Sequence, residues 1–222
     1  RALLNSMGCP SDGADAVTGR LGGARPHDVV LGVSIGPNAD TPADQRVDDY
    51  KTLVDHFAPL ADYLAVNVSS PNTSGLRDLQ GAPLRGLLAA ILEERDRTGT
   101  GVPLVVKLSP DIDDLAAVVN AAEASGVDGI IFGNTTIRHQ EGRGGLSGAP
   151  LGSSALRGLE QIRGLTGLPI IACGGIMTPE DAAARIDAGA TLVQLYTGLV
   201  YAGPGLVRKT ARALQRRPPA IR

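Results

Sequence analysis

The stretch of this chain whose residue types best fit enzyme chemistry is 67–77, which reads NVSSPNTSGLR. An apolar run at 64–66 leads into Asn67, and the hydroxyl of Ser70 and the amide of Asn72 follow within a few residues. Pro71 cannot continue a strand ladder, and Gly75 lets the following loop move. Because polar groups gathered at the end of a buried strand are typical of substrate pockets in α/β folds, we interpret this segment as a candidate active-site loop.

A second chemical feature is a positive charge inside an apolar strand pattern. Lys107 lies in the sequence LVVKL at 104–108. Burial of an ammonium group without a partner is strongly unfavourable, so we expect this lysine to meet an anion or several hydrogen-bond acceptors. A lysine on an edge strand whose long side chain reaches solvent is the alternative.

Glycines late in the sequence could approach a phosphate group. They are Gly144 and Gly145 with Gly148, and the pair Gly174 and Gly175. Backbone N–H groups after the last two strands form the usual phosphate site of a (β/α)8 barrel, and glycine lets the backbone come close. No G-x-G-x-x-G follows the first strand, which disfavours a Rossmann fold.

Six short apolar runs, each bounded by Gly, Pro, Asn or Asp, predict β-strands. They span 29–35, 63–68, 104–108, 129–132, 169–172 and 192–195. Amphipathic segments predict helices at 41–60, 110–124, 153–163 and 182–188, with start signals at Thr41-Pro42 and Thr178-Pro179. The βα repetition predicts an α/β protein with a parallel sheet, and the late glycines favour a TIM barrel over a doubly wound sheet.

The composition limits the classes of protein and site. The chain has 222 residues, a formal net charge of −2 and no basic cluster, so neither nucleic acid nor an anionic membrane is indicated as a partner. No apolar run approaches the ~20 residues of a membrane span. Two distant cysteines, Cys9 and Cys173, indicate a reduced cytoplasmic setting, with Cys173 as a small core residue. His27, His56 and His139 show no metal-ligand spacing, so we expect them at the surface and expect no metal site.

The loop, the strand lysine and the late glycines, taken in order, resemble the quinone-using, membrane-linked class of dihydroorotate dehydrogenases, from Arg1 to about Leu214. Ser70 selects that class, because the soluble class carries Cys there. The resemblance implies a TIM barrel that oxidises dihydroorotate to orotate in pyrimidine biosynthesis. It further implies FMN as the cofactor, a quinone as the electron acceptor and Ser70 as the catalytic base.

The same resemblance implies roles for further residues. Those expected to bind the substrate are Asn5, Asn67, Asn72, Asn134 and Thr135. Those expected to bind the flavin are Ser34, Asn67, Lys107, Gly133, Gly148, Gly175, Tyr196 and Thr197. Ser34 and Gly133 stand where the family usually has Asn and Thr. Each lost hydrogen bond would weaken flavin binding by ~0.5–1.5 kcal/mol.

The resemblance also implies that segments preceding Arg1 in the family are missing here. These are the quinone-site helices and the first two barrel strands, so we expect 1–222 to be a single flavin-binding barrel domain with about six βα units and two exposed sheet edges. A full-length bacterial enzyme of this class would lie peripherally on the cytoplasmic face of the inner membrane through that missing part, and this chain alone would be soluble. The alternatives are a non-catalytic truncated remnant and another phosphate-binding barrel enzyme.

Overall fold

The fold is built on one parallel sheet of six strands, in the spatial order β2-β3-β4-β5-β7-β8. The computed structural model describes residues 1–23 and 28–216. The strands are β1 (Ala2–Asn5), β2 (Gly32–Ile35), β3 (Tyr63–Asn67), β4 (Leu104–Leu108), β5 (Gly129–Phe132), β6 (Gly145–Gly148), β7 (Ile170–Cys173) and β8 (Leu192–Gln194). The predicted parallel sheet is confirmed, and all six predicted strands are present with slightly shifted ends.

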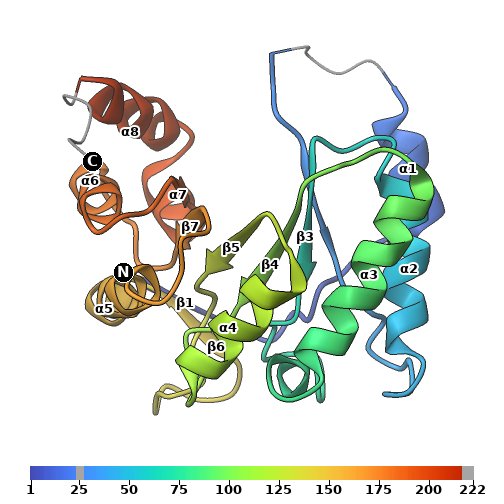
Figure 1. Cartoon of the computed structure of the whole chain (residues 1–222). Helices are drawn as coiled ribbons and strands as arrows, with labels where there is room; N and C mark the ends of the chain where they lie inside the picture. The colour runs from blue at the N-terminus through green and yellow to red at the C-terminus, as the bar shows by residue number, and fades with distance from the viewer. Residues whose placement is uncertain (24–27, 217–222) are drawn as a thin grey trace.

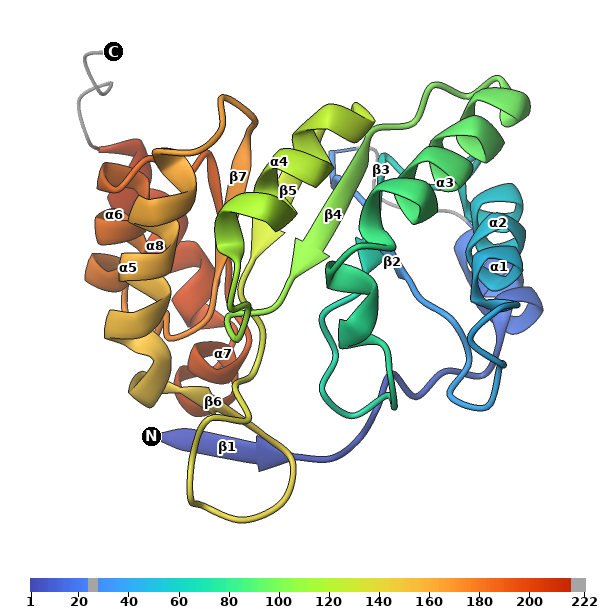
Figure 2. The same ribbon diagram turned by 60° about the horizontal axis from the view of Figure 1, so that its bottom comes forward.

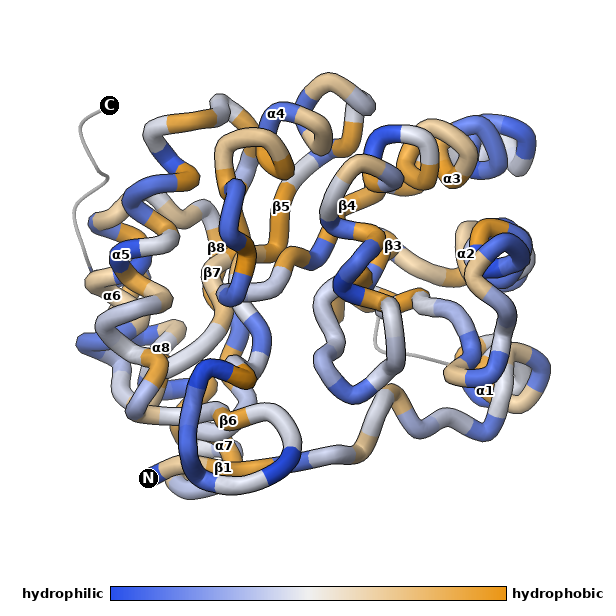
Figure 3. Tube along the Cα trace, turned by 90° about the horizontal axis from the view of Figure 1, so that it is seen from below, coloured by the Kyte–Doolittle hydropathy of each residue, from blue (hydrophilic) through white to orange (hydrophobic). Residues whose placement is uncertain are grey.

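Helices follow the strands and cover one face of the sheet (Figure 1). They are α1 (Ala14–Leu21), α2 (Arg46–Phe57), α3 (Leu84–Thr98), α4 (Leu115–Ser125), α5 (Gly152–Arg163), α6 (Pro179–Asp187), α7 (Thr197–Ala202) and α8 (Gly205–Gln215), with 3-10 turns η1 (Arg77–Gln80) and η2 (Ala149–Leu151). Seen from below in Figure 3, the strands form an arc and the helices lie around its outside. This is the curvature of a barrel wall.

The two faces of the sheet carry cores of unequal size because successive strand residues point to opposite sides. Leu64 and Val66 of β3 face outward into a large cluster that includes Leu88 and Ile91 of α3, all fully buried. The inner face holds a small cluster, which consists of Ala65, Val105, Ile131 and Ile171. Most of the folding free energy from apolar burial therefore lies between the sheet and its helices.

Two helix starts that the sequence predicts have different outcomes. Thr178 caps α6 with a full capping box, because its side chain accepts from the N–H of Asp181 and Asp181 accepts in return. The start predicted at Thr41 is wrong, since α2 begins at Arg46. The Thr41 hydroxyl instead donates to the Asp49 carboxylate at 2.7 Å, and 42–45 form a turn before the helix.

An antiparallel pair of strands, β1 and β6, was not predicted from the sequence. Asn5 pairs with Gly145, and Figure 2 shows β1 and β6 together at one end of the molecule, outside the parallel sheet. The β6 sequence GLSG carries little apolar pattern, and its partner lies about 140 residues away in the chain. Helices α1, α3, α7 and α8 were also not predicted.

The outer strands of the parallel sheet are β2 and β8. Within 1–23 and 28–216, no strand pairs with the outer side of either one. Leu192 of β8 is 58% exposed, and Val29 and Val30 before β2 are also exposed. In the same part of the chain, no helix is long and apolar enough to cross a membrane.

Candidate functional site

A cavity of about 860 Å³ opens where the parallel strands end. Its walls come from the loops after β3, β5, β7 and β8, from the β1–β6 pair and from the segment at 7–10. Every residue expected to bind substrate or flavin lines this cavity except Gly133, whereas the candidate glycines Gly144 and Gly145 do not line it. The fold therefore brings together residues that are spread over most of the chain.

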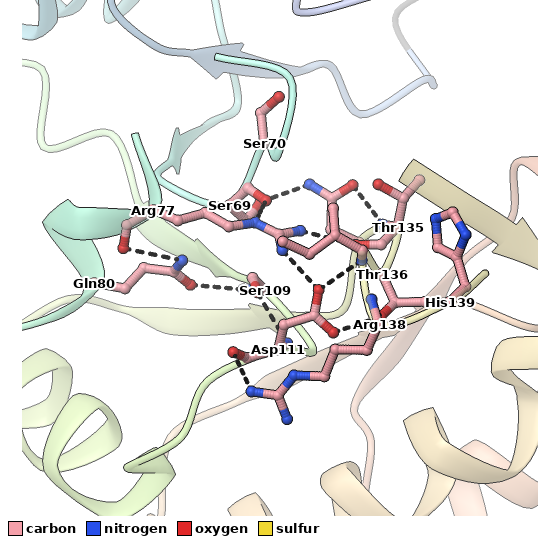
Figure 4. A network of polar contacts seen from close by, with 12 residues as sticks. Ser69, Ser70, Arg77, Gln80, Ser109, Asp111, Thr135, Thr136, Arg138 and His139 are labelled. Atoms are coloured by element: carbon pink, nitrogen blue, oxygen red, sulfur yellow. Dashed lines mark hydrogen bonds and ion pairs between the residues drawn. The ribbon is translucent and has the colours of Figure 1, made fainter. Parts of the chain in front are cut away.

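Ser70 lies at the cavity wall and is only 6% exposed. Its Oγ accepts a hydrogen bond from the N–H of Asn72 at 3.3 Å. In Figure 4 the Ser70 side chain points away from the polar network beside it. The hydroxyl is thus oriented by the backbone while its own proton stays available to a ligand.

Two of the predicted amides, Asn67 and Asn134, are joined through the hydroxyl of Ser69. Ser69 Oγ donates to Asn67 Oδ1 at 2.6 Å and accepts from Asn134 Nδ2 at 2.8 Å. Asn134 Oδ1 also accepts from the N–H of Thr135 at 2.7 Å. These bonds orient both amides, and the Nδ2 group of Asn67 points toward Cys9 Sγ at 3.6 Å, on the cavity side.

The other two amides, Asn5 and Asn72, contact each other. Asn72 Nδ2 donates to Asn5 Oδ1 at 3.1 Å and to the Asn5 carbonyl at 3.2 Å. The pair ties the Ser70 loop to β1. Four amides from three separate segments therefore surround one end of the cavity.

Lys107 pairs in register with Asn67 across β3 and β4, and its side chain lines the cavity. Its Nζ donates to the carbonyl of Gly133 at 3.1 Å, and burial lowers the pKa of its ammonium group. Among the described residues, no carboxylate forms an ion pair with it. Strand β4 is central, so the alternative of an edge-strand lysine is wrong.

Gly133 contributes to the site through its backbone. It is buried, with φ at 117°, and a Cβ atom there would lie 2.1 Å from the carbonyl oxygen of Cys173. A threonine could not fit this close approach of β5 and β7. The glycine presents its carbonyl to Lys107 without lining the cavity itself.

The opposite end of the cavity is formed largely by backbone. Gly148, Gly174 and Gly175 line it together with Tyr196 and Thr197. Gly175 has φ at 69°, and a Cβ atom there would lie 2.4 Å from the nitrogen of Gly152. The loop after β7 can approach the start of α5 this closely only with glycine.

Arg185 of α6 lies behind these glycines and was not predicted from the sequence. It is 3% exposed, and its Nη2 donates to the carbonyls of Gly152 at 2.7 Å and Gly174 at 3.3 Å. Its Nε has no hydrogen-bond partner among the residues that the structure describes, and burial lowers the pKa of the guanidinium. A buried positive charge therefore supports the glycine end of the cavity.

The predictions for the cysteines and histidines have mixed outcomes. Cys173 packs against the small inner cluster, as predicted for a core residue, but it is only half-buried and also lines the cavity. The His56 side chain lies at the surface as predicted, where its hydrogen bonds are exposed, whereas His139 is half-buried with its Nε2 2.9 Å from the carbonyl oxygen of Gly144. His27 lies outside the described residues. Across the described ranges, no group of three or more His, Cys, Asp or Glu side chains could hold a metal ion.

Comparison with known proteins places this site in a family. A family model described as dihydroorotate dehydrogenase matches residues 1–217. This chain belongs to the dihydroorotate dehydrogenase family. It is 41% identical to a dihydroorotate dehydrogenase (quinone) of Acidovorax sp. (strain JS42), over 97% of this chain and 68% of the relative. It is 48% identical to one of Thermobifida fusca (strain YX), over 96% of this chain and 62% of the relative.

Solved structures of the dihydroorotate dehydrogenase family have the same fold. A ligand-free enzyme from Eimeria tenella superposes with a TM-score of 0.86 at 36% identity, covering 96% of this chain and 68% of the other. The same enzyme in complex with ferulenol gives 0.85 at 35% identity, covering 96% and 66%. The six-stranded sheet is thus part of a TIM barrel, and the chain spans about two thirds of the length of these relatives.

Dihydroorotate dehydrogenases are generally flavin-dependent, and the cavity fits such a cofactor. Its middle holds the Lys107 ammonium group, which lacks a carboxylate partner among the described residues. One end offers glycine backbone with Arg185 behind it, and the other offers amides. The Lys107 ammonium group matches an electron-accepting ring, the glycine end matches a phosphate tail, and the amide end matches a polar substrate.

Proposed function

We propose that this protein oxidises dihydroorotate to orotate, with FMN as its cofactor, a quinone as the final electron acceptor and Ser70 as the base. The observation that carries the proposal is that Ser70, Lys107 and the four predicted asparagines line one cavity. The family membership of the chain and the names of its relatives support the same reaction.

The residues around Ser70 would hold the pyrimidine ring. Asn5, Asn67, Asn72 and Asn134 can each donate and accept, which suits a ring that carries carbonyl, N–H and carboxylate groups. Thr135 would contact the substrate beside Asn134. Ser70 Oγ would take the proton from one ring carbon as its own hydroxyl proton passes to water or to neighbouring groups of the loop, while Oγ stays oriented by the N–H of Asn72. FMN supplies a two-electron acceptor for the hydride that leaves the adjacent ring carbon.

The remaining predicted residues would hold FMN. Lys107 would lie beside the electron-accepting ring, where its positive charge favours added negative charge. Gly148, Gly175, Tyr196 and Thr197 would surround the phosphate. Ser34, on the outer strand β2, would contact the cofactor from the opposite wall.

We further propose that 1–222 is one flavin-binding barrel domain whose remaining strands belong to a preceding segment. The exposed outer sides of β2 and β8 support this, because two more strands there would complete a ring of eight. Helices preceding those strands would supply the quinone site and a peripheral contact with the inner membrane, on its cytoplasmic face in a bacterium.

Flavin titration of the 222-residue chain beside a chain extended by the two strands tests the proposal. We expect weak or no FMN binding by the short chain and restored binding by the longer one, followed as flavin fluorescence quenching. Dihydroorotate should then bleach the flavin absorbance of the longer chain. A longer chain that binds no flavin would support the non-catalytic remnant, and tight stoichiometric binding by the short chain would refute the need for two more strands.

A further inference from the structure

A buried ion pair joins the loops that follow β3 and β4. Arg77 Nη1 lies 2.7 Å from Asp111 Oδ2, and the two side chains are 17% and 7% exposed. Arg77 begins η1, just after the Ser70 loop, and Asp111 lies in the loop after β4. Neither residue lines the cavity.

The other two nitrogens of the Arg77 guanidinium bind backbone on either side of the proposed substrate. Nε donates to the carbonyl of Ser69 at 2.9 Å, and Nη2 donates to the carbonyl of Thr135 at 2.8 Å. Ser69 directly precedes Ser70, and Thr135 directly follows Asn134. Figure 4 shows the guanidinium between these two segments.

Asp111 binds the residues that directly follow Thr135. Its Oδ1 accepts from the hydroxyl of Thr136 at 2.5 Å, and its Oδ2 accepts from the N–H of Ile137 at 2.9 Å. On the other side of the pair, Gln80 of η1 accepts from the N–H of Ser109 at 2.7 Å. The ends of β3, β4 and β5 are thus connected through one charged network.

We propose that Arg77 and Asp111 are positioning residues that fix Ser70 relative to Asn134 and Thr135. The inference rests on the proposed role of Ser70 as base. A planar guanidinium has donors in fixed directions and can reach two carbonyls and a carboxylate at once, whereas a lysine ammonium in its place could not keep all three. Since a misplacement of ~1 Å at a reacting group can slow a reaction by ~10²-fold, the network controls turnover from outside the cavity.

Arg77→Lys in the extended, flavin-loaded chain is the main test, with Asp111→Asn as a second variant. We expect turnover to fall by ~10–100-fold while flavin content stays unchanged. Asp113→Asn is the matched control, because it removes only the ion pair of Arg138 with a carboxylate that is 94% exposed. It should change turnover by less than ~2-fold. Normal turnover in Arg77→Lys with full flavin content would overturn the proposal.

A double-mutant cycle separates positioning from general stability. If Arg77 acts through Ser70, Arg77→Lys should cause little further loss of turnover in a Ser70→Ala background. Equal fold-losses in both backgrounds would refute the positioning role. If Ser70→Ala alone keeps normal turnover, the proposed base is wrong. Amide hydrogen exchange then tests separately whether Arg77 holds the two loops. Arg77→Lys should speed exchange in 70–76 and 134–138 together, and unchanged exchange in either segment would refute it.

Discussion

The two ends of the cavity present different chemical groups to a ligand. The end beside β3, β4 and β5 is made of side chains, since Asn67, Ser69 and Asn134 orient one another and Arg77 holds their loops. The end beside β6, β7 and β8 is made of backbone, where Gly175 packs against Gly152. The same cavity therefore has one wall that depends on functional groups and another that depends on the absence of a side chain.

This difference follows from what each end has to bind. A pyrimidine ring presents donors and acceptors in a set pattern, which only oriented amides and hydroxyls can match. A phosphate accepts hydrogen bonds from any N–H that comes close, so open backbone with a positive charge behind it suffices. Side-chain deletions should thus damage the first end, and added side chains should damage the second.

The predictions apply to the extended, flavin-binding chain, and the largest effect is expected at the side-chain end, from Ser70→Ala. Turnover should fall by ~10²–10⁴-fold, because the proton acceptor is removed, while flavin and orotate binding change little. Steady-state kinetics and spectral titration with orotate measure the two quantities separately. Ser125→Ala, which removes a hydroxyl that donates to the carbonyl of Ala121 within α4, is the control. Near-normal turnover in Ser70→Ala would show that this end does not act through the hydroxyl.

At the backbone end, Gly175→Ala in the extended chain should weaken FMN binding by at least ~10-fold and destabilise the fold by ~2–4 kcal/mol, through a strained φ and overpacking against Gly152. Gly101→Ala is the matched control, because Gly101 also has a positive φ of 61° but has nothing within 4 Å of an added Cβ. That variant should lose only ~1–2 kcal/mol. Thermal unfolding and flavin titration measure both effects, and equal losses in the two variants would contradict the close-approach argument.

Lys107→Met tests the group between the two ends. Removal of the charge should lower the midpoint potential of the bound flavin by ~30–60 mV and slow its reduction by dihydroorotate at saturating substrate. Spectroelectrochemical titration measures the potential. Lys209→Met, at an exposed position of α8, is the control and should leave the midpoint potential unchanged. An unaltered potential in flavin-loaded Lys107→Met would mean that the lysine does not face the flavin ring.

The smallest effect is expected from Arg185→Met, which removes the charge behind the glycines. FMN affinity should fall by ~3–10-fold while riboflavin affinity stays the same, because only FMN carries a phosphate. Comparison of the two ligands cancels any general damage to the cavity. Arg212→Met, on the last turn of α8, is a control for surface charge. A parallel loss of both affinities would show that Arg185 supports the loops without attracting the phosphate.

Much of the side-chain end could be predicted from local sequence. Asn67, Ser70 and Lys107 stand out because polar or charged residues interrupt apolar runs, and any sheet must place them at a strand end or inside a strand. The strands themselves followed from apolar runs bounded by breakers, and the parallel sheet followed from their alternation with helices. These features depend on residues close together in the chain, so a short window contains them.

Long-range contacts decided the rest. Asn5 reaches Asn72 only because β1 pairs with β6, and Arg77 meets Asp111 and Thr135 only because three parallel strands end side by side. Arg185 has no local pattern that marks it as buried, since carbonyls at the start of α5 and the end of β7 create its environment. The sequence by itself determined which groups could do chemistry, and the tertiary structure decided their partners, because hydrogen-bond geometry and burial depend on segments far apart in the chain.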